Sequence, residues 1–79
     1  MDFFVEIGSG DGLMEYIVDV DRDCWSRLTN FRAEPAELVR LTFKFLLEHE
    51  QKEMILKKFN LSDVIGHFPN FEIEIKRLL

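Results

Sequence analysis

The sequence predicts a small α+β domain, in which an N-terminal antiparallel β-hairpin packs on a long central helix that is followed by two or three short helices. Apolar and polar residues alternate on both sides of a glycine-rich loop at residues 8–12, whereas apolar residues recur at helical spacing after Glu34 and Pro35. The length of 79 residues suits one domain only, so residues 1–79 are expected to form a single unit. A hydrophobic content of 47%, with eight Phe, excludes a disordered chain.

The N-terminal segment predicts two strands joined by a tight loop. The first strand places Phe3, Val5 and Ile7 on one face and Phe4 on the other, and residues 13–20 continue the alternation. The loop between them contains three Gly, which adopt positive φ without steric cost. Because an isolated hairpin is marginally stable in water, we expect the helices to cover its apolar face.

The segment after the second strand has two interpretations. A short helix here would be capped by Asp23 and would carry Cys24 and Trp25. Residues 24–29 also fit a third strand, and the sequence leaves both alternatives open.

Pro35 marks the start of the longest predicted helix, which runs to about Gln51. Proline in the first turn loses no hydrogen bond, and Glu34 and Glu37 are favourable near the positive end of the helix dipole. The polar stripe of this helix is narrow, and the rest of its circumference is apolar: Leu38, Val39, Leu41, Phe43, Phe45, Leu46 and Leu47. A helix with so little polar surface is expected to be packed on two sides.

The C-terminal part predicts further short helices. Residues 52–59 form one of them, which Asn60 would end in the left-handed conformation. Ser62 would cap the next, which stops before Pro69. Residues 71–76 fit a strand by alternation and a helix by apolar spacing. We favour the helix, because Glu, Lys, Arg and Leu at the C-terminal end of the chain have high helix propensity.

The patterns that resemble phosphate and calcium sites are incomplete. A strand follows the glycine loop, where phosphate binding would need a helix N-terminus. Residues 19–23 begin like a calcium loop, but Cys24 stands where the sharp turn needs glycine and Asn30 where a bidentate carboxylate is needed.

The two histidines and the single cysteine are too few for a metal site or a framed catalytic pair. His49 has only Glu53 one helical turn away, whereas a metal site needs three or four ligands. Nucleophilic catalysis would require Cys24 to meet His49 or His67 in space. We therefore expect no enzymatic activity, no metal and no cofactor. A lone cysteine also excludes an intramolecular disulfide and fits a reducing cytoplasm.

The net charge of −5 opposes general affinity for nucleic acid and makes such a partner the less favoured one. Residues 52–68 nevertheless outline a helix-turn-helix, with a basic patch formed by Lys52, Lys57 and Lys58. A small nucleic-acid-binding regulator is therefore the alternative function. The sequence has neither an export signal nor about 18 consecutive apolar residues, so we expect no membrane association and a cytoplasmic location.

Aromatic residues exceed what one small core readily hides, and the surplus indicates an interface. The residues expected there are Phe4, Trp25, Phe31, Phe68 and Phe71. The leading interpretation is a non-enzymatic protein-interaction module that self-associates as a homodimer. The sequence does not identify any other protein partner.

Apolar residues at regular spacing, together with the Phe68-Pro69 pair, form a pattern over about residues 41–75. In this pattern the chain is similar to a group of short, uncharacterised bacterial proteins. The similarity implies a bacterial protein with a recurring helical half, and it supplies no activity and no site residue.

Overall fold

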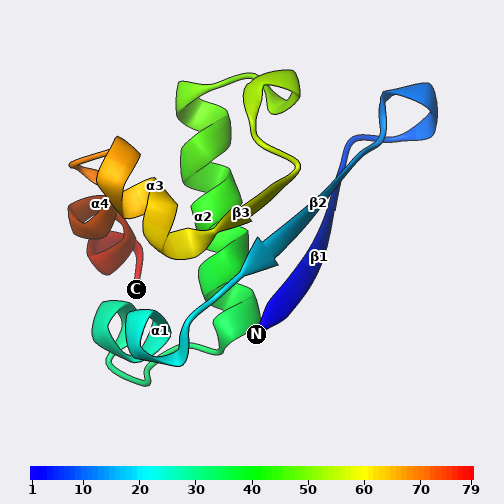
Figure 1. The fold of residues 1–79 in the computed structure, drawn as a ribbon. Helices are drawn as coiled ribbons and strands as arrows, with labels where there is room; N and C mark the ends of the chain where they lie inside the picture. Colours follow the sequence, from blue (N-terminus) through cyan, green and yellow to red (C-terminus); the bar gives the residue numbers. More distant parts are fainter.

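The computed structural model describes residues 1–79 and contains a three-stranded sheet and four α-helices, which confirms the α+β class. Along the chain, the elements are β1 (Asp2–Ile7), the 3-10 turn η1 (Gly10–Gly12), β2 (Met14–Asp19), α1 (Arg22–Thr29), α2 (Pro35–His49), the 3-10 turn η2 (Lys52–Met54), β3 (Lys58–Asn60), α3 (Leu61–His67) and α4 (Phe71–Leu78). Figure 1 shows α2 upright, with the β1–β2 hairpin on one side and α1, α3 and α4 gathered on the other.

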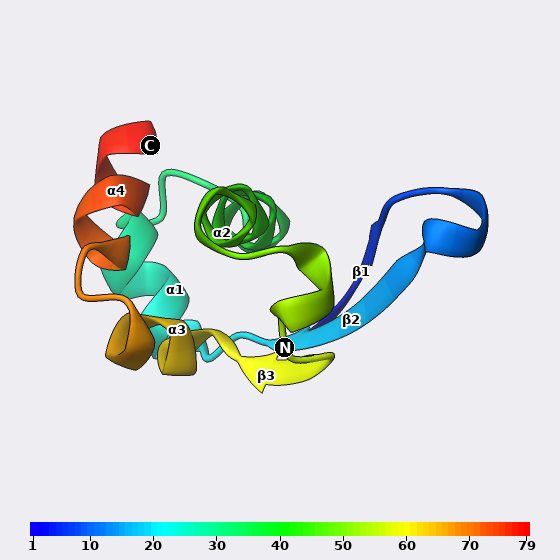
Figure 2. The same cartoon turned by 90° about the horizontal axis from the view of Figure 1, so that it is seen from above.

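The sheet has the order β1-β2-β3, with β2 in the middle. β1 and β2 are antiparallel and place Phe3 opposite Val18 and Val5 opposite Tyr16. β3 runs parallel to β2, with Phe59 opposite Val18, and it lies at the edge away from β1 (Figure 2). Along β1 the side chains alternate between exposed and half-buried, as the sequence pattern predicted.

The glycine loop of the hairpin is fastened to the turn after α2. Gly8 has a φ of +99°, and a Cβ atom there would lie 2.6 Å from the carbonyl oxygen of Gly12. The Lys52 ammonium donates to that same carbonyl oxygen at 2.5 Å. The hydroxyl of Tyr16 in turn donates to the Lys52 carbonyl at 2.6 Å. These contacts hold η2 against the hairpin.

Residues 22–29 form helix α1, which decides between the two alternatives left open by the sequence. The residue before the helix is Asp21, which makes no side-chain capping hydrogen bond, so the predicted cap at Asp23 was wrong. Asn30 ends the helix with a φ of +51° and donates its N–H to the Ser26 carbonyl at 2.8 Å.

The predicted helix over residues 52–59 was also wrong. Only η2 is helical, and the chain then extends so that β3 joins the sheet. The N–H of Ile17 in β2 donates to the Lys57 carbonyl at 2.7 Å, which satisfies a backbone donor that the hairpin alone would leave open. This tertiary pairing outweighs the helical spacing of the apolar residues, and it leaves Leu56, within the predicted helix, exposed to solvent.

Asn60 starts a helix instead of ending one. Its φ is −94°, and its side-chain oxygen accepts the Ser62 N–H at 2.9 Å, while the Asp63 carboxylate accepts the Asn60 N–H at 3.3 Å. This reciprocal capping box begins α3, so the predicted cap at Ser62 was wrong as well. The helix does end before Pro69, as expected.

The core gathers buried side chains from β2 and from all four helices. Leu41, Phe45 and Leu46 of α2 are buried. Residues 71–78 form helix α4, which settles the open alternative, and its Phe71 lies edge-on to Phe45 with ring centroids 5.2 Å apart. Figure 2, which views α2 end-on, shows α1 and α4 beside it. None of the helices has the length and apolar character needed to cross a bilayer.

Candidate binding groove

The structure separates the five aromatic residues that the sequence assigned to an interface. Phe4 is 81% exposed on β1, and Phe31 is 66% exposed in the loop after α1. Trp25 and Phe68 are half-buried, and Phe71 is completely buried in the core, where it is not available to a partner. They therefore do not form one continuous surface.

Two of these aromatic residues form a small local cluster. The Trp25 ring lies edge-on to Phe31 at a centroid distance of 5.2 Å, and its indole N–H donates to the Ala33 carbonyl at 2.7 Å. Phe31 has a φ of +62°, directly after the left-handed Asn30. Positive φ is unusual for a bulky residue, so this loop is held in place by its contacts.

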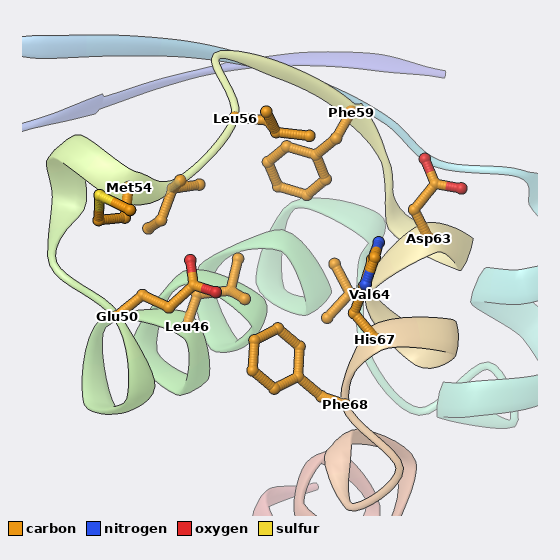
Figure 3. Close-up of a pocket in the computed structure, with 10 residues that line it drawn as sticks. Leu46, Glu50, Met54, Leu56, Phe59, Asp63, Val64, His67 and Phe68 are labelled. Atoms are coloured by element: carbon orange, nitrogen blue, oxygen red, sulfur yellow. The ribbon is translucent and has the colours of Figure 1, made fainter.

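A groove of about 480 Å³ lies where the end of α2, the 50–57 segment, β3 and α3 meet. Figure 3 shows its lining, which is mostly apolar. The floor is formed by three buried side chains, Leu46, Ile55 and Val64. Phe59 and Phe68 add aromatic walls. We call this feature the Met54 groove, after the most exposed of its apolar residues.

The rim of the Met54 groove carries two large apolar side chains in solvent. Met54 is 71% exposed and Leu56 is 69% exposed. Both follow from the failure of residues 52–59 to form a helix, since η2 and the extended chain behind it turn Ile55 inward and leave its neighbours on the outside. A continuous helix would have let this segment bury an apolar face.

Polar groups of mostly negative charge stand at the edges of the groove. In Figure 3 the Glu50 carboxylate points into it from the position directly after α2, and Asp63 and His67 stand on the opposite wall, on α3. Neither carboxylate takes part in an ion pair. The groove therefore combines an apolar floor with two carboxylates whose charge is not neutralised by a neighbouring cation.

Sequence reasoning missed most of this groove. It placed Leu56 inside a helix and gave Met54 and Glu50 no role. The signal that was present is the high density of large apolar residues in this segment, since Met54, Ile55, Leu56 and Phe59 fall within six positions.

The three lysines of the predicted basic patch differ in their surroundings. Lys52 is occupied by the Gly12 carbonyl, while Lys57 and Lys58 are exposed and make no ion pair. Because residues 52–59 are not helical, the first helix of the expected helix-turn-helix is absent. Residues 52–68 therefore do not form the helix-turn-helix on which the nucleic-acid-binding alternative was based.

Cys24 and the two histidines lie on different elements. Burial raises the pKa of the Cys24 thiol, and the charged groups that act on it are Arg27, Asp21 and Glu72. The ring of His49, at the end of α2, packs against the rings of Phe45 and Phe68, with centroid distances of 4.4 Å and 5.8 Å. No group of three or more His, Cys, Asp or Glu side chains is placed to hold a metal ion.

No family model, no curated protein and no solved structure matches the chain. Functional inference therefore rests on the geometry of the molecule.

Proposed function

We propose that the protein is a non-enzymatic protein-interaction module, whose Met54 groove receives a short segment of a partner protein that combines apolar side chains with a flanking Lys or Arg. The observation that carries this proposal is the exposure of Met54 and Leu56 at the rim of an apolar groove. Leaving two such side chains in water forfeits the free energy that their burial would contribute, about 1.5–3 kcal/mol each. A partner that covers them recovers it.

The composition of the groove suits a peptide better than a polar metabolite. Its volume lies in the range of ligand sites, and its lining is predominantly apolar with a few polar groups at the edge. Methionine is flexible and polarisable, which lets Met54 adapt to different apolar side chains.

Charge supplies the second half of the recognition. Glu50 and Asp63 lie at opposite edges of the groove, and the whole chain carries a net charge of −5. A basic flank on the partner would be attracted to this surface, whereas an acidic segment would be repelled. The cationic residue is therefore part of the proposed specificity.

We also propose that α2 is the central element on which the hairpin packs, and that this packing makes the groove rigid. Two ring contacts support this arrangement. The ring centroids of Tyr16 of β2 and Phe43 of α2 are 5.1 Å apart, and those of Phe43 and Phe59 of β3 are 5.9 Å apart. A floor formed before binding avoids the entropic cost of ordering it on association.

We likewise propose a cytoplasmic location, with which the buried free Cys24 is compatible.

Selection from a peptide library displayed on phage tests the proposal. Immobilised protein is expected to enrich peptides with two or three apolar residues next to Lys or Arg. Peptides synthesised from the enriched sequences should bind the Leu56→Asp variant at least about tenfold more weakly, which corresponds to about 1.4 kcal/mol. The matched control is Ile73→Asp, since Ile73 is a comparably exposed apolar residue on α4, outside the groove.

A second substitution tests the electrostatic half. Glu50→Lys should weaken binding of the basic peptides and strengthen binding of peptides in which the Lys or Arg is replaced by Glu. Enrichment of acidic peptides by the wild-type protein, or equal binding to the Leu56→Asp and Ile73→Asp variants, would contradict the proposal.

A further inference from the structure

β1 forms an open edge of the sheet, because β2 pairs with only one of its two sides. The strand contains no proline, lysine or bulge, which are features that commonly block pairing at an edge. Phe4 on this strand is more exposed than any other large apolar side chain of the chain. An edge with these properties is a template for another strand.

The hydrogen bonds of β2 show which groups of β1 face outward. The N–H of Ile17 points to the Lys57 carbonyl, so the backbone N–H and C=O groups of Ile17 point toward β3. The backbone groups of the next residue on either side point toward β1. One of those neighbours, Tyr16, lies opposite Val5, whose backbone groups are therefore used inside the hairpin. Because backbone direction alternates along a strand, the unpaired N–H and C=O groups at the open edge belong to Asp2, Phe4 and Glu6.

A shallow apolar groove of about 520 Å³ lies beside this edge, between β1 and α2. We call it the β1 groove, and most of its apolar lining comes from Phe3, Val5, Ile7, Val39, Phe43 and Leu47. A strand added to β1 would place the side chains of its inner face over this groove.

We propose that the occupant is a second copy of the chain, whose β1 pairs antiparallel with this β1 about a two-fold axis at Val5. In this register Val5 lies opposite Val5 of the second copy, Phe3 lies opposite Ile7, and Phe4 lies opposite Glu6. Phe4 and Glu6 both point their backbone groups outward, so these pairs carry the hydrogen bonds between the copies. The two Val5 residues form the close pair without hydrogen bonds, with Cα atoms about 4.5 Å apart.

The charges of β1 select this register. A shift of two residues in one direction places Asp2 opposite Glu6, and a shift of two in the other direction places Glu6 opposite Glu6, so that like charges face each other. A shift of one residue would turn the apolar residues of one strand to the wrong face. Of these registers, the proposed one alone pairs the apolar residues with each other and keeps every carboxylate opposite an uncharged residue.

Pairing through β1 closes on itself as a dimer. It uses the long open edge of both copies, and the remaining edge of each sheet is β3, which has only three residues.

Disulfide cross-linking tests the dimer and its register. Val5→Cys is expected to form a covalent dimer under mild oxidation, because the two thiols would meet at a distance suited to a disulfide. Phe4→Cys serves as the matched control, since it is more exposed but lies opposite Glu6, and it should cross-link at least about tenfold more slowly. The native Cys24 is buried and does not compete. Faster cross-linking of Phe4→Cys, or a Val5→Cys variant that stays monomeric, would overturn the proposal.

Sedimentation gives a second measurement that needs no introduced cysteine. The wild-type protein is expected to dimerise with rising concentration, and Phe4→Pro should stay monomeric, because proline removes an outward N–H and leaves the hairpin bonds in place. Leu56→Asp should dimerise like the wild type, so that loss of peptide binding and loss of the dimer can be told apart. A wild-type protein that is monomeric at millimolar concentration, or a dimer that Leu56→Asp abolishes and Phe4→Pro does not, contradicts pairing through β1.

Discussion

Truncation of Phe71 tests the packing on which the whole domain depends. This side chain is completely buried, and its ring lies edge-on to Phe45 at 5.2 Å, where α4 meets α2. Truncating a buried Phe to Ala costs about 3–5 kcal/mol. A domain of 79 residues has a total stability of about 4–12 kcal/mol at the usual 0.05–0.15 kcal/mol per residue. Phe71→Ala is therefore expected to remove about a quarter or more of the stability.

Two further variants separate the contributions. Phe71→Leu keeps most of the apolar volume and loses the ring pair, so we expect a cost of about 1–2 kcal/mol. Ile73→Ala, two residues further along the same helix, changes a side chain that is 60% exposed and should alter the stability by less than about 0.5 kcal/mol.

Urea unfolding followed both by far-UV circular dichroism and by Trp25 fluorescence measures these free energies, and coincidence of the two transitions shows that unfolding is two-state. The order of cost should be Phe71→Ala, then Phe71→Leu, then Ile73→Ala. If Phe71→Ala costs less than about 1 kcal/mol, or no more than Ile73→Ala, then α4 does not pack on α2 as described and the burial argument is refuted.

Three more changes have defined outcomes. Asn60→Ala should destabilise the protein by about 1 kcal/mol in urea unfolding, because it removes the oxygen that caps α3. Gly8→Ala should be destabilising, since it combines a positive φ with a Cβ clash, whereas Gly66→Ala, in open space within α3, should stabilise by about 0.5–1 kcal/mol. Stability should also fall at alkaline pH, and less so above pH about 10 in the Tyr16→Phe variant, as measured by unfolding at several pH values.

The controls for the first two changes lie in the chain itself. Asn70 precedes α4 but makes no capping hydrogen bond, so Asn70→Ala should cost little, and equal effects at Asn60 and Asn70 would exclude the capping explanation. For the glycines, a Gly8→Ala variant as stable as the wild type would show that the loop is not held in the described conformation.

The direction of the alkaline effect follows from two pKa shifts. Burial and the nearby Glu53 carboxylate raise the pKa of Tyr16, and burial raises the pKa of Cys24. The folded state therefore keeps these protons to higher pH than the unfolded state does. Their contribution is complete below the unfolded pKa values, about 8.5 for Cys and about 10 for Tyr, and is lost as pH rises through the folded values. If the loss of stability at alkaline pH is the same in Tyr16→Phe as in the wild type, then the ionisation of Tyr16 does not contribute to it.

What the sequence by itself determined are the features that depend on residues close together in the chain. The alternation around Val5 predicts β1 and its two faces, and Pro35 marks the first residue of α2. Both signals are local, because alternation and helical spacing reflect the geometry of the backbone over a few residues. The assignment of residues 71–76 to a helix, favoured by propensity, has the same origin.

Tertiary structure alone decided the segment after α2, and with it the Met54 groove. β3 has only three residues, and it is stabilised by the open side of β2, where Ile17 offers its N–H to Lys57. That donor lies forty residues away from its acceptor in the chain, so no local pattern around residue 58 could reveal it. The same holds for the aromatic residues, because burial of Phe71 and exposure of Phe31 depend on which element lies opposite each ring, and the chain meets those elements only when it folds.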